Sequence, residues 1–364
     1  MSYYIFGAKA TATGLYKALS VLRPEITIKA FLVSKQDENL NSIWGCPVRS
    51  IFDVSDGLSD VEKQQAQVFV AVPELIHTEI EAVINQCGFY NLIMIDSHLE
   101  AKIMGEYYDV EGRFRSVRKL DAVQSKPLPA VTMYQACFYL DKPLKNQPSL
   151  LEFHKTLYLG CYGAKESGVD INGKADYYDN TGDNISQLNH LRCEMTAHYW
   201  IWKNKLDTLD EYVGVCHYRR LLDLTDDDIR RIKQNDVDVV LPYPMLHYPN
   251  SQIQHTWYVE EKDWILTKKV VKELYPEYGE KFDEVFSQHY FYNYNILLAK
   301  KKVFSDYCSW LFPILDRIEK LSNPRGEERN DRYTAYLSES LETLYFMTNM
   351  NDLCIYHTGK LLFV

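Results

Sequence analysis

The chain has 364 residues, which is enough for about two domains of ordinary size. Hydrophobic residues make up 46% and charged residues 25% of it, as is usual for a soluble globular protein. The formal net charge of −10 argues against bulk nucleic-acid binding, which needs a basic surface, although a local basic site stays compatible with it. We therefore expect no nucleic-acid partner.

The eight cysteines show neither a CxxC pair nor the spacing of metal ligands, and most lie in apolar runs. This pattern predicts buried free thiols in a reducing compartment. The first residues lack the pattern of a signal peptide, and no apolar run approaches the ~20 residues that span a bilayer. We expect a cytoplasmic protein, and peripheral association with the inner membrane face stays open. The 28 tyrosines fit a tyrosine-rich core and a sugar-stacking surface equally well.

Residues 1–120 alternate short apolar runs with amphipathic stretches, which predicts a Rossmann-like parallel sheet. The first turn, from Gly7 to Gly14, lacks the middle glycine of a dinucleotide-binding loop and is too long for one. A scaffolding or partner-docking role is therefore favoured over nucleotide binding, although the following helix N-terminus could hold an anion. The expected strands are 3–8, 27–34, 67–72 and 91–96, and the expected helices are 13–22 and 74–87.

Pro127 and Pro129 mark a domain boundary. We predict an accessory domain over 1–120 and a second α/β domain over 128–364. In the second domain, residues 166–182 are rich in Gly, Asp and Asn, which predicts a mobile or substrate-covering loop. The expected strands there are 130–136, 155–161, 212–216, 237–241 and 292–299, and the expected helices are 185–203, 226–233, 261–275, 279–290, 303–321 and 332–347.

The helix predicted over 185–203 begins at Asn184, which with Gln187 approximates a capping box. Apolar and aromatic residues cover most of its sides, so it should be largely buried. A buried Glu194 then needs a partner, for which Arg219 or Arg220 is the obvious candidate.

The apolar strand predicted over 212–216 ends on His217-Tyr218-Arg219-Arg220. Polar side chains at the carboxyl end of a strand commonly build ligand sites in α/β folds, and an arginine fork suits the oxygens of a diphosphate. The competing interpretation is a structural ion pair with Glu194 or Asp223. His217 is a candidate acid, base or donor to a sugar hydroxyl, and is equally well explained as a structural histidine.

Glu339, in the middle of the last predicted helix, is a candidate catalytic base, since inverting sugar transfer needs a carboxylate to deprotonate the acceptor hydroxyl. An exposed helix charge, shared with Glu342, is the alternative. The run of three aspartates at 226–228 is better explained as a helix N-terminus than as a metal site. We expect no metal and no other cofactor, with a divalent metal possible in principle but not favoured.

Several blocks carry a family resemblance: DNIS, CEMTAHYWIWKN, YVGVCHYRR, DVVLP, NILLAKKKVFSDYCSWLFPIL, and Arg332 with YLSESL. Together they resemble a bacterial family of domains of unknown function, found in capsular and exopolysaccharide gene clusters and taken to be GT-A-like glycosyltransferases. The resemblance covers about residues 130–350 and includes HYRR intact at His217–Arg220; at Met195 the family more often has an aliphatic residue. The first domain resembles the Rossmann-like domains that precede sugar-modifying enzymes, through FGA…TG and FVAVPE…GF.

The resemblance implies a GT-A-like fold, a nucleotide-sugar donor, particularly a UDP-sugar, and a glycan or lipid-linked acceptor. In this hypothesis Arg219 and Arg220 neutralise the diphosphate in place of a metal, Glu194 orients one of them, and Glu339 is the base beside His217. The remaining candidates for donor binding are Tyr134, Gln135, Ala136, Gly163, Ala164, Asp183, Asn184 and Lys203. The candidates for acceptor binding are His255, Trp257 and Asn295, the first two in the His- and aromatic-rich stretch 245–258.

Two other classes compete with a glycosyltransferase. A non-catalytic protein that binds nucleotide sugars or glycans would keep the cleft and lack the chemistry. A Rossmann-type oxidoreductase is disfavoured, because the chain lacks both GxGxxG and a Tyr-x-x-x-Lys motif in its first domain.

Overall fold

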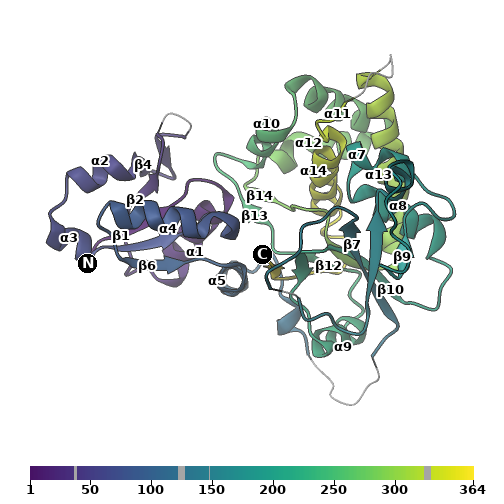
Figure 1. Cartoon of the computed structure of the whole chain (residues 1–364), viewed down its shortest axis with the longest axis horizontal. Coiled ribbons are helices and arrows are strands. Elements are labelled where there is room, and N and C mark those ends of the chain that lie inside the picture. Colours follow the sequence, from purple (N-terminus) through teal and green to yellow (C-terminus); the bar gives the residue numbers. More distant parts are fainter. Residues whose placement is uncertain (37–38, 122–127, 147, 324–328) are drawn as a thin grey trace.

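The computed structural model describes residues 1–36, 39–121, 128–146, 148–323 and 329–364. The boundary predicted at Pro127 and most of the charged loop at 323–331 lie outside these residues. The division into domains at 120–128 therefore stays a prediction. The chain nevertheless builds two separate main sheets, one on each side of this region (Figure 1).

The first sheet is built within residues 3–94 and has the strand order β3-β4-β2-β1-β5-β6. All neighbouring pairs are parallel except β3 and β4. Helices connect β1 to β2, β4 to β5 and β5 to β6, whereas the chain passes from β2 to β4 through β3. Its strands are β1 (Tyr3–Phe6), β2 (Ile28–Val33), β3 (Ser42–Ile43), β4 (Cys46–Ser50), β5 (Gln67–Val70) and β6 (Asn91–Met94), and its helices are α1 (Ala10–Leu22), α2 (Ile51–Asp56), α3 (Asp60–Gln65), α4 (His77–Gln86) and α5 (Ser97–Glu111).

The second sheet has nine strands, seven of which follow the order β16-β12-β15-β10-β7-β8-β9. β10, β7, β8 and β9 are parallel, whereas β15 runs antiparallel to both its neighbours. A short ribbon of β11 and β17 continues from the end of β10, and β13 and β14 pair separately. The strands are β7 (Val131–Phe138), β8 (His154–Leu159), β9 (Tyr177–Tyr178), β10 (Tyr212–His217), β11 (Arg220–Leu222), β12 (Val239–Pro242), β13 (Met245–Leu246), β14 (Tyr290–Phe291), β15 (Leu297–Lys300), β16 (Ile355–Thr358) and β17 (Lys360–Leu362).

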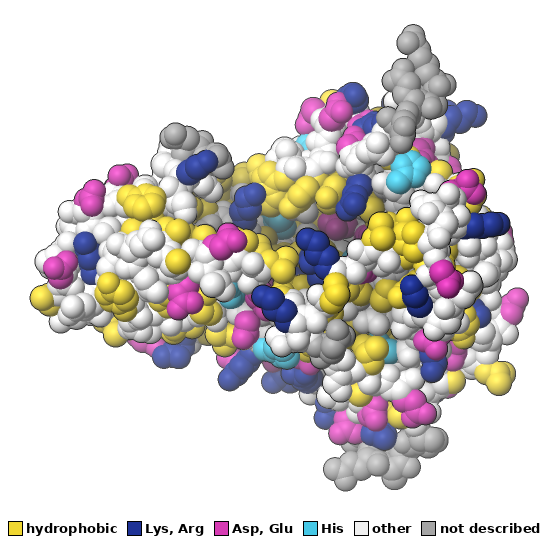
Figure 2. Space-filling model, viewed as in Figure 1, with side chains coloured by type: hydrophobic (Ala, Val, Ile, Leu, Met, Phe, Trp, Pro, Cys, Tyr) yellow, Lys and Arg dark blue, Asp and Glu magenta, His cyan; other side chains and the backbone are white. Residues whose placement is uncertain are grey.

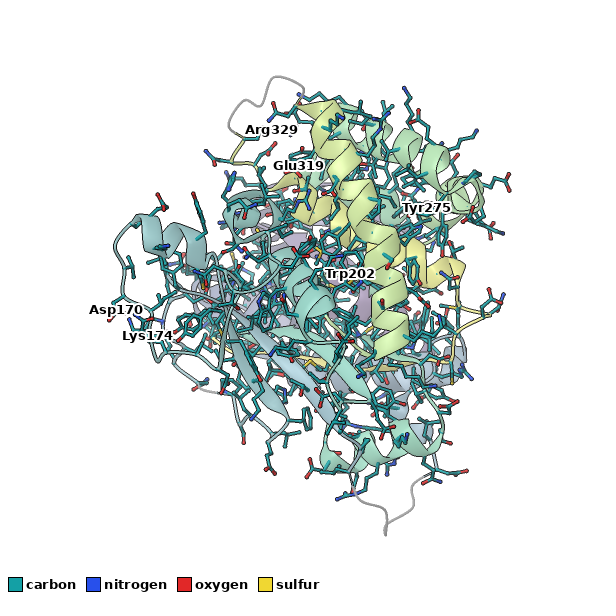
Figure 3. The ribbon with its side chains drawn as sticks, turned by 90° about the vertical axis from the view of Figure 1, so that its right-hand side faces the viewer. Asp170, Lys174, Trp202, Tyr275, Glu319 and Arg329 are labelled. Atoms are coloured by element: carbon teal, nitrogen blue, oxygen red, sulfur yellow. The ribbon has the colours of Figure 1, made fainter. Side chains whose placement is uncertain are left out.

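Helices cover both faces of the second sheet, because successive side chains of its central strands point to opposite sides. On β10, Val213 and Val215 join the core beneath α8 and α13, while Tyr212 and Cys216 join the core beneath α9. In Figure 3, Trp202 of α8 lies beside α13, where its ring stacks on Phe312 at 5.6 Å. The helices are α6 (Cys161–Glu166), α7 (Asn189–Arg192), α8 (Met195–Asn204), α9 (Asp226–Gln234), α10 (His255–Tyr258), α11 (Glu261–Leu274), α12 (Pro276–Phe286), α13 (Lys301–Ser322) and α14 (Tyr333–Thr348).

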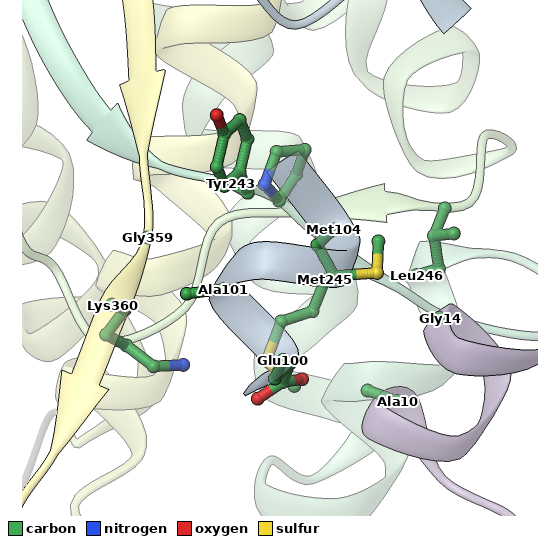
Figure 4. A pocket seen from close by; sticks show the side chains of 11 residues that line it. Ala10, Gly14, Glu100, Ala101, Met104, Tyr243, Met245, Leu246, Gly359 and Lys360 are labelled. Carbon is green, nitrogen blue, oxygen red and sulfur yellow. The ribbon is translucent and has the colours of Figure 1, made fainter. Parts of the chain in front are cut away.

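The two parts of the molecule are joined through α5, which lies between them in Figure 1. Tyr108 of α5 donates a hydrogen bond of 2.6 Å to the Pro244 carbonyl, and the backbone N–H of Leu362 donates one of 2.8 Å to the Ser97 hydroxyl. Figure 4 shows the small cavity of about 30 Å³ left at this contact, with Glu100 and Lys360 at its wall. Met104, Tyr107 and Tyr108 belong to the same hydrophobic cluster as the helices of the second part. Helix α5 therefore packs into a core of the second part, whereas the first sheet has two further hydrophobic clusters of its own.

Two predicted elements differ from the structure. The single helix expected over 185–203 is broken at Cys193, whose φ of +45° separates α7 from α8. The capping box expected at Asn184 and Gln187 is replaced by a turn in which Asn184 Oδ1 accepts the Ser186 N–H. The strand expected over 292–299 forms only at 297–300, because Tyr294 and Asn295 adopt positive φ angles of +78° and +50°. Both interruptions lie beside the candidate site described below.

The loop predicted over 166–182 is partly core, contrary to expectation. Asp179 is fully buried and accepts hydrogen bonds from the N–H groups of Gly160 and Cys161 and from the hydroxyls of Ser186 and Thr196, at 2.6–3.0 Å. The adjacent pair 177–178 forms the edge strand β9. The polar composition of this segment therefore reflects one buried carboxylate that organises the chain around it.

Candidate functional site

A first cavity of about 420 Å³ opens at the carboxyl ends of the parallel strands β7, β8 and β10. This is where α/β sheets commonly bind ligands, because side chains from several strands converge there. We call it the strand-end cavity. Its wall consists of Ala136, Phe138, Asp141, Leu159, Asn189, His190, Cys193, Glu194, His217, Tyr218, Asn330 and Arg332.

A second cavity of about 620 Å³ lies between the two parts of the molecule, and we call it the interface cavity. Figure 2 shows that the surface between the two parts is hollowed on the viewed face, with hydrophobic and basic side chains around the hollow. One wall of the cavity comes from the carboxyl ends of β1, β2 and β5 and the start of α1. The opposite wall includes Arg220, His247, Gln254, Trp257, Tyr258, Asn293, Tyr294, Tyr336 and Glu339.

A buried polar cluster connects the two cavities. Asn295, which is completely buried, donates one hydrogen bond of 2.6 Å to Glu194 of the strand-end cavity and another of 3.0 Å to the Ser338 hydroxyl. Burial raises the pKa of Glu194, while the Asn295 hydrogen bond and the charges of Arg220 and Arg332 act in the opposite direction. The predicted partner of Glu194 is therefore corrected: the hydrogen bond comes from an amide, and the arginines act through their field.

Glu339 lies on the other side of this cluster, at the wall of the interface cavity. Only 8% of the residue is exposed. Burial, followed by the charge of Glu194, raises the pKa of Glu339 to about 8, whereas Arg220 and Lys360 pull it down. A carboxyl group with a pKa near neutrality is suited to accept a proton in catalysis. The alternative prediction, an exposed helix charge, is wrong for both Glu339 and Glu342, since both are buried.

His217 lies at the wall of the strand-end cavity, and burial followed by the charge of Arg220 lowers its pKa to about 3. The imidazole is therefore neutral at physiological pH. Its Nε2 is buried and meets no hydrogen-bond partner among the described residues. This places His217 as a neutral donor or acceptor toward the cavity rather than as a positively charged acid.

The two arginines of HYRR lie in a tight hairpin, Arg219 in the turn and Arg220 at the start of the returning strand β11. β10 ends at His217, which pairs antiparallel with Arg220 at the start of β11. Arg220 lies over the Tyr294 ring at 4.3 Å and lines the interface cavity. Arg219 lies over Tyr218 at 5.5 Å, and its charge lowers the pKa of Asp141, which burial raises to about 6. The two guanidinium groups therefore have different surroundings.

Backbone strain is concentrated around the two cavities. Among the described residues other than glycine, six have positive φ angles, and four of them, Cys193, Tyr294, Asn295 and Arg332, line a cavity or bond to Glu194. Such conformations cost about 1–3 kcal/mol each and persist where the surrounding structure enforces them, commonly at functional sites. The strain supports the assignment of this region as the candidate site.

The structure brings together only part of the predicted set. The strand-end cavity includes Ala136, Glu194 and His217, and the interface cavity includes Arg220, Trp257 and Glu339. Asn295 lines neither cavity but donates a hydrogen bond to Glu194. The other candidates line neither cavity: Tyr134, Gln135, Gly163, Ala164, Asp183, Asn184, Lys203, Arg219 and His255.

These other candidates have structural surroundings. Tyr134 packs against Trp200 in the core, and Gln135 donates to the Tyr218 carbonyl at 3.1 Å. Lys203 lies 3.5 Å from the centroid of the Trp202 ring. His255 stacks on Trp264 at 4.4 Å. Of the remainder, Ala164 is fully buried, Asp183 accepts from the Tyr199 hydroxyl at 3.2 Å, and Asn184 donates to the Gly182 carbonyl.

Sequence reasoning named Arg332 in the family resemblance without selecting it as a site residue, and it lines the strand-end cavity immediately before the sixteen-residue helix α14. The side chain of its N-cap residue, Arg332 itself, makes no capping hydrogen bond, and the positive end of the helix dipole and the guanidinium together favour an anion in the cavity. The signal available in the sequence was an arginine directly preceding a long helix that ends up almost entirely buried. His247 and Asn293 were likewise not selected as site residues, although both line the interface cavity.

A divalent metal, which related folds often use, fits the donor set of the strand-end cavity poorly. Its two carboxylates are already engaged, Glu194 with Asn295 and Asp141 with the Phe138 N–H at 2.7 Å. In the described part of the chain, the group of three acidic side chains close enough to share an ion is Glu260, Asp263 and Asp331. Arg329 donates to the latter two and already supplies a positive charge there.

The run of aspartates at 226–228 begins α9, as predicted. Thr225 caps that helix, and Asp228 completes a capping box. Within the described ranges, no helix combines the length and the apolar character needed to cross a bilayer.

Comparison with solved structures finds the WbbM bifunctional glycosyltransferase in its apo form, with a TM-score of 0.51 and 24% sequence identity. The match covers 64% of this chain and 45% of that chain, so the protein corresponds to less than half of WbbM. The likeness concerns the fold, and it confirms the predicted α/β class: a Rossmann-like parallel sheet followed by a GT-A-like domain. No curated protein matches the chain.

Residues 154–350 match a family model described as a domain of unknown function, DUF4422. The matched segment contains Glu194, His217 and Arg332 of the strand-end cavity and Glu339 of the interface cavity. Since it spans more than half of the 364 residues, the chain belongs to the DUF4422 family.

Proposed function

We propose that the protein is a glycosyltransferase, specifically a hexosyltransferase that uses a nucleotide sugar, most naturally a UDP-sugar. The acceptor is a glycan or a lipid-linked saccharide in bacterial capsule or exopolysaccharide synthesis. The observation that carries the proposal is Glu339: a buried carboxyl group with a pKa of about 8, at the wall of one cavity and within the field of Glu194 in the other. The fold likeness to WbbM and the family resemblance support the same reaction class.

The donor is assigned to the strand-end cavity. Arg332 and the positive end of the α14 dipole would meet the diphosphate, because cations and helix N-termini both stabilise negative charge. This role was first expected of Arg219 and Arg220, but Arg332 is the arginine that lines this cavity. Neutral His217 and the nearby Asn189 would hydrogen-bond to sugar or ribose hydroxyls.

The acceptor hydroxyl approaches from the side of Glu339. In its deprotonated form, which a pKa of about 8 makes the minor form at neutral pH, Glu339 takes the proton as the acceptor oxygen attacks the anomeric carbon, and the bond between that carbon and the diphosphate breaks. The nucleoside diphosphate leaves with the bonding electron pair, stabilised by Arg332. Glu194, held by Asn295, positions its charge so that Glu339 has a higher affinity for the proton than an ordinary carboxylate.

A panel of UDP-, GDP- and dTDP-sugars tests the proposal. We expect a UDP-sugar to raise the melting temperature and to be hydrolysed slowly to UDP, with and without EDTA. The Glu339→Gln variant should keep the thermal shift and lose turnover by about 10²–10⁴-fold, as expected for removal of a general base.

The outcomes separate the competing classes. Binding without turnover in the wild-type protein, even with saccharide acceptors present, would favour a non-catalytic nucleotide-sugar or glycan-binding protein. Absence of binding by every nucleotide sugar would refute the donor site. Full activity of Glu339→Gln would refute the assignment of the base.

A further inference from the structure

We propose that the interface cavity is the acceptor site, that it binds a neutral saccharide, and that the first sheet forms one of its walls. The inference rests on the proposed function and adds to it a substrate class and a role for the N-terminal part of the chain. Acceptor binding was expected at His255, Trp257 and Asn295, of which only Trp257 lines this cavity.

The cavity contains buried polar atoms that need a ligand or water. His247 is 2% exposed and Asn293 8% exposed, and both line the cavity. Neither ring nitrogen of His247 has a hydrogen-bond partner among the described residues, and the Oδ1 of Asn293 has none there either. The Asn293 amide lies close enough to oppose the lowering of the His247 pKa, but the pair falls short of hydrogen-bond geometry. Unpaired buried polar atoms are costly, so a ligand in the cavity toward which either side chain can turn would be favoured.

The chemistry of these atoms favours a polyhydroxylated ligand, and the cations of the same wall, Lys9 and Arg220, lie over the rings of Trp257 and Tyr294. Burial lowers the pKa of His247 to about 4, so the ring is neutral and offers one donor and one acceptor. Asn293 adds an amide with both functions. Hydroxyl groups can donate and accept, and several of them on one ring can satisfy both side chains together.

Aromatic side chains provide the apolar surface that a sugar ring also needs. Trp257, 36% exposed, and Tyr258, 45% exposed, both line the cavity, and Tyr258 stacks on Tyr336 at 4.6 Å. Rings with one exposed face pack against the C–H face of a pyranose. The volume of about 620 Å³ lies within the usual range of ligand sites. Glu339 in the same wall would meet the reacting hydroxyl.

The first sheet supplies the opposite wall. Gly7, Ser34 and Val72 follow the carboxyl ends of β1, β2 and β5, and all three line the cavity. Lys9, just before α1, reaches across and places its Nζ 4.8 Å from the centroid of the Trp257 ring. The edge where a Rossmann-like sheet ordinarily binds a nucleotide therefore faces the second part of the chain.

The packing of neighbouring strands accounts for Gly7 without a bound nucleotide. Its φ is +118°, and a Cβ atom there would lie 2.5 Å from the carbonyl oxygen of Ala71 on the neighbouring strand. The glycine is thus required by packing between strands, not by the approach of a pyrophosphate. The lack of a middle glycine in this turn agrees with that interpretation.

Saccharide binding can be measured without turnover. Methyl glycosides of glucose, galactose, mannose, rhamnose and N-acetylglucosamine, and their disaccharides, are titrated by saturation-transfer NMR and by tryptophan fluorescence, with NAD and ATP as competing probes. We expect at least one glycoside to bind, and Trp257→Ala and His247→Phe to weaken it about tenfold or more, since each removes a stacking or hydrogen-bonding contact.

The wall from the first sheet is tested by Ser34→Trp, which fills the cavity from that side, against Ser20→Trp on the exposed surface of α1. We expect Ser34→Trp to weaken glycoside binding about tenfold or more, and Ser20→Trp to bind the glycoside and hydrolyse the nucleotide sugar like the wild type. Unchanged glycoside binding by Ser34→Trp would overturn the role of the first sheet. Binding of NAD or ATP but no glycoside would overturn the substrate class. Failure of donor hydrolysis in the wild type would instead count against the proposed function, because glycoside binding is measured independently of it.

Discussion

The Glu339→Gln variant tests the electrostatic description of the site without any substrate. Glutamine preserves the shape of the side chain and removes its titration. In the folded protein, burial and the charge of Glu194 raise the pKa of Glu339 from 4.5 to about 8. The folded chain therefore binds this proton more tightly than the unfolded chain does.

The magnitude follows from linkage between proton binding and folding. A rise of the pKa from 4.5 to about 8 corresponds to up to ~5 kcal/mol, because each pKa unit is worth ~1.36 kcal/mol. Below pH 4.5 the Glu339 carboxyl group is protonated in both the folded and the unfolded state, so it does not change how stability depends on pH. Between 4.5 and about 8 the folded state holds more protons, so the stability of the wild type falls as the pH rises through this window. The variant lacks this loss.

The assay is urea unfolding followed by circular dichroism, from about pH 5 to about pH 9, with the exposed Glu280→Gln on α12 as the matched control. We expect the stability of Glu339→Gln relative to the wild type to increase by several kcal/mol across this range, and that of the control to stay flat. Parallel pH profiles for Glu339→Gln and the wild type would refute the raised pKa. If Glu339→Gln has a higher free energy of unfolding and has lost transfer activity, the Glu339 carboxyl group serves the reaction at a cost in folding stability.

Three further predictions concern the frame of the site. Arg332→Ala should raise the KM for the nucleotide sugar about tenfold or more with little change in unfolding free energy, since the side chain is exposed; an unchanged KM would remove Arg332 from the donor site. Asp179→Asn should cost ~2–4 kcal/mol in urea unfolding, because the carboxylate accepts four hydrogen bonds and the new NH₂ group would face donors. Gly214→Ala should lower stability by ~1–3 kcal/mol, since its Cβ would lie 2.5 Å from the Leu297 carbonyl oxygen, whereas Gly57→Ala, with contacts of 3.6 Å or more, should be nearly neutral; equal melting temperatures for the two would contradict this packing.

The layout of the sheets was predictable because it depends on periodicity. Strands 28–33, 67–70 and 212–217 lie within or close to the expected ranges, since buried parallel strands are nearly continuous apolar runs bounded by breakers. The sequence could not reveal that β11 returns beside β10 at Arg220, because one hairpin of this kind leaves no period. The expected pairing of the two arginines on a diphosphate assumed an open strand end.

The site itself was only partly predictable. Glu194 was identified as a carboxylate in a helix predicted to be buried, and Glu339 as a candidate base in the middle of the last predicted helix. The breaks at Cys193 and at Tyr294–Asn295 are imposed by tertiary contacts, and the local sequence favours helix and strand there. Asp179 was not identified either, because its four donors lie 7 to 19 residues away along the chain and follow no local pattern.

Helix α14 has a further consequence for the distance between the leaving group and the base. It begins just after Arg332 in one cavity and carries Glu339 in the other, seven residues further along. At 1.5 Å per residue this is a spacing of ~10 Å along one axis. All but a few of its residues are buried, so the helix is held rigidly by its surroundings. The distance between the leaving group and the base would therefore be fixed by the helix. Any hinge between the two parts of the chain would then change which acceptor is admitted, and would leave that interval as it is.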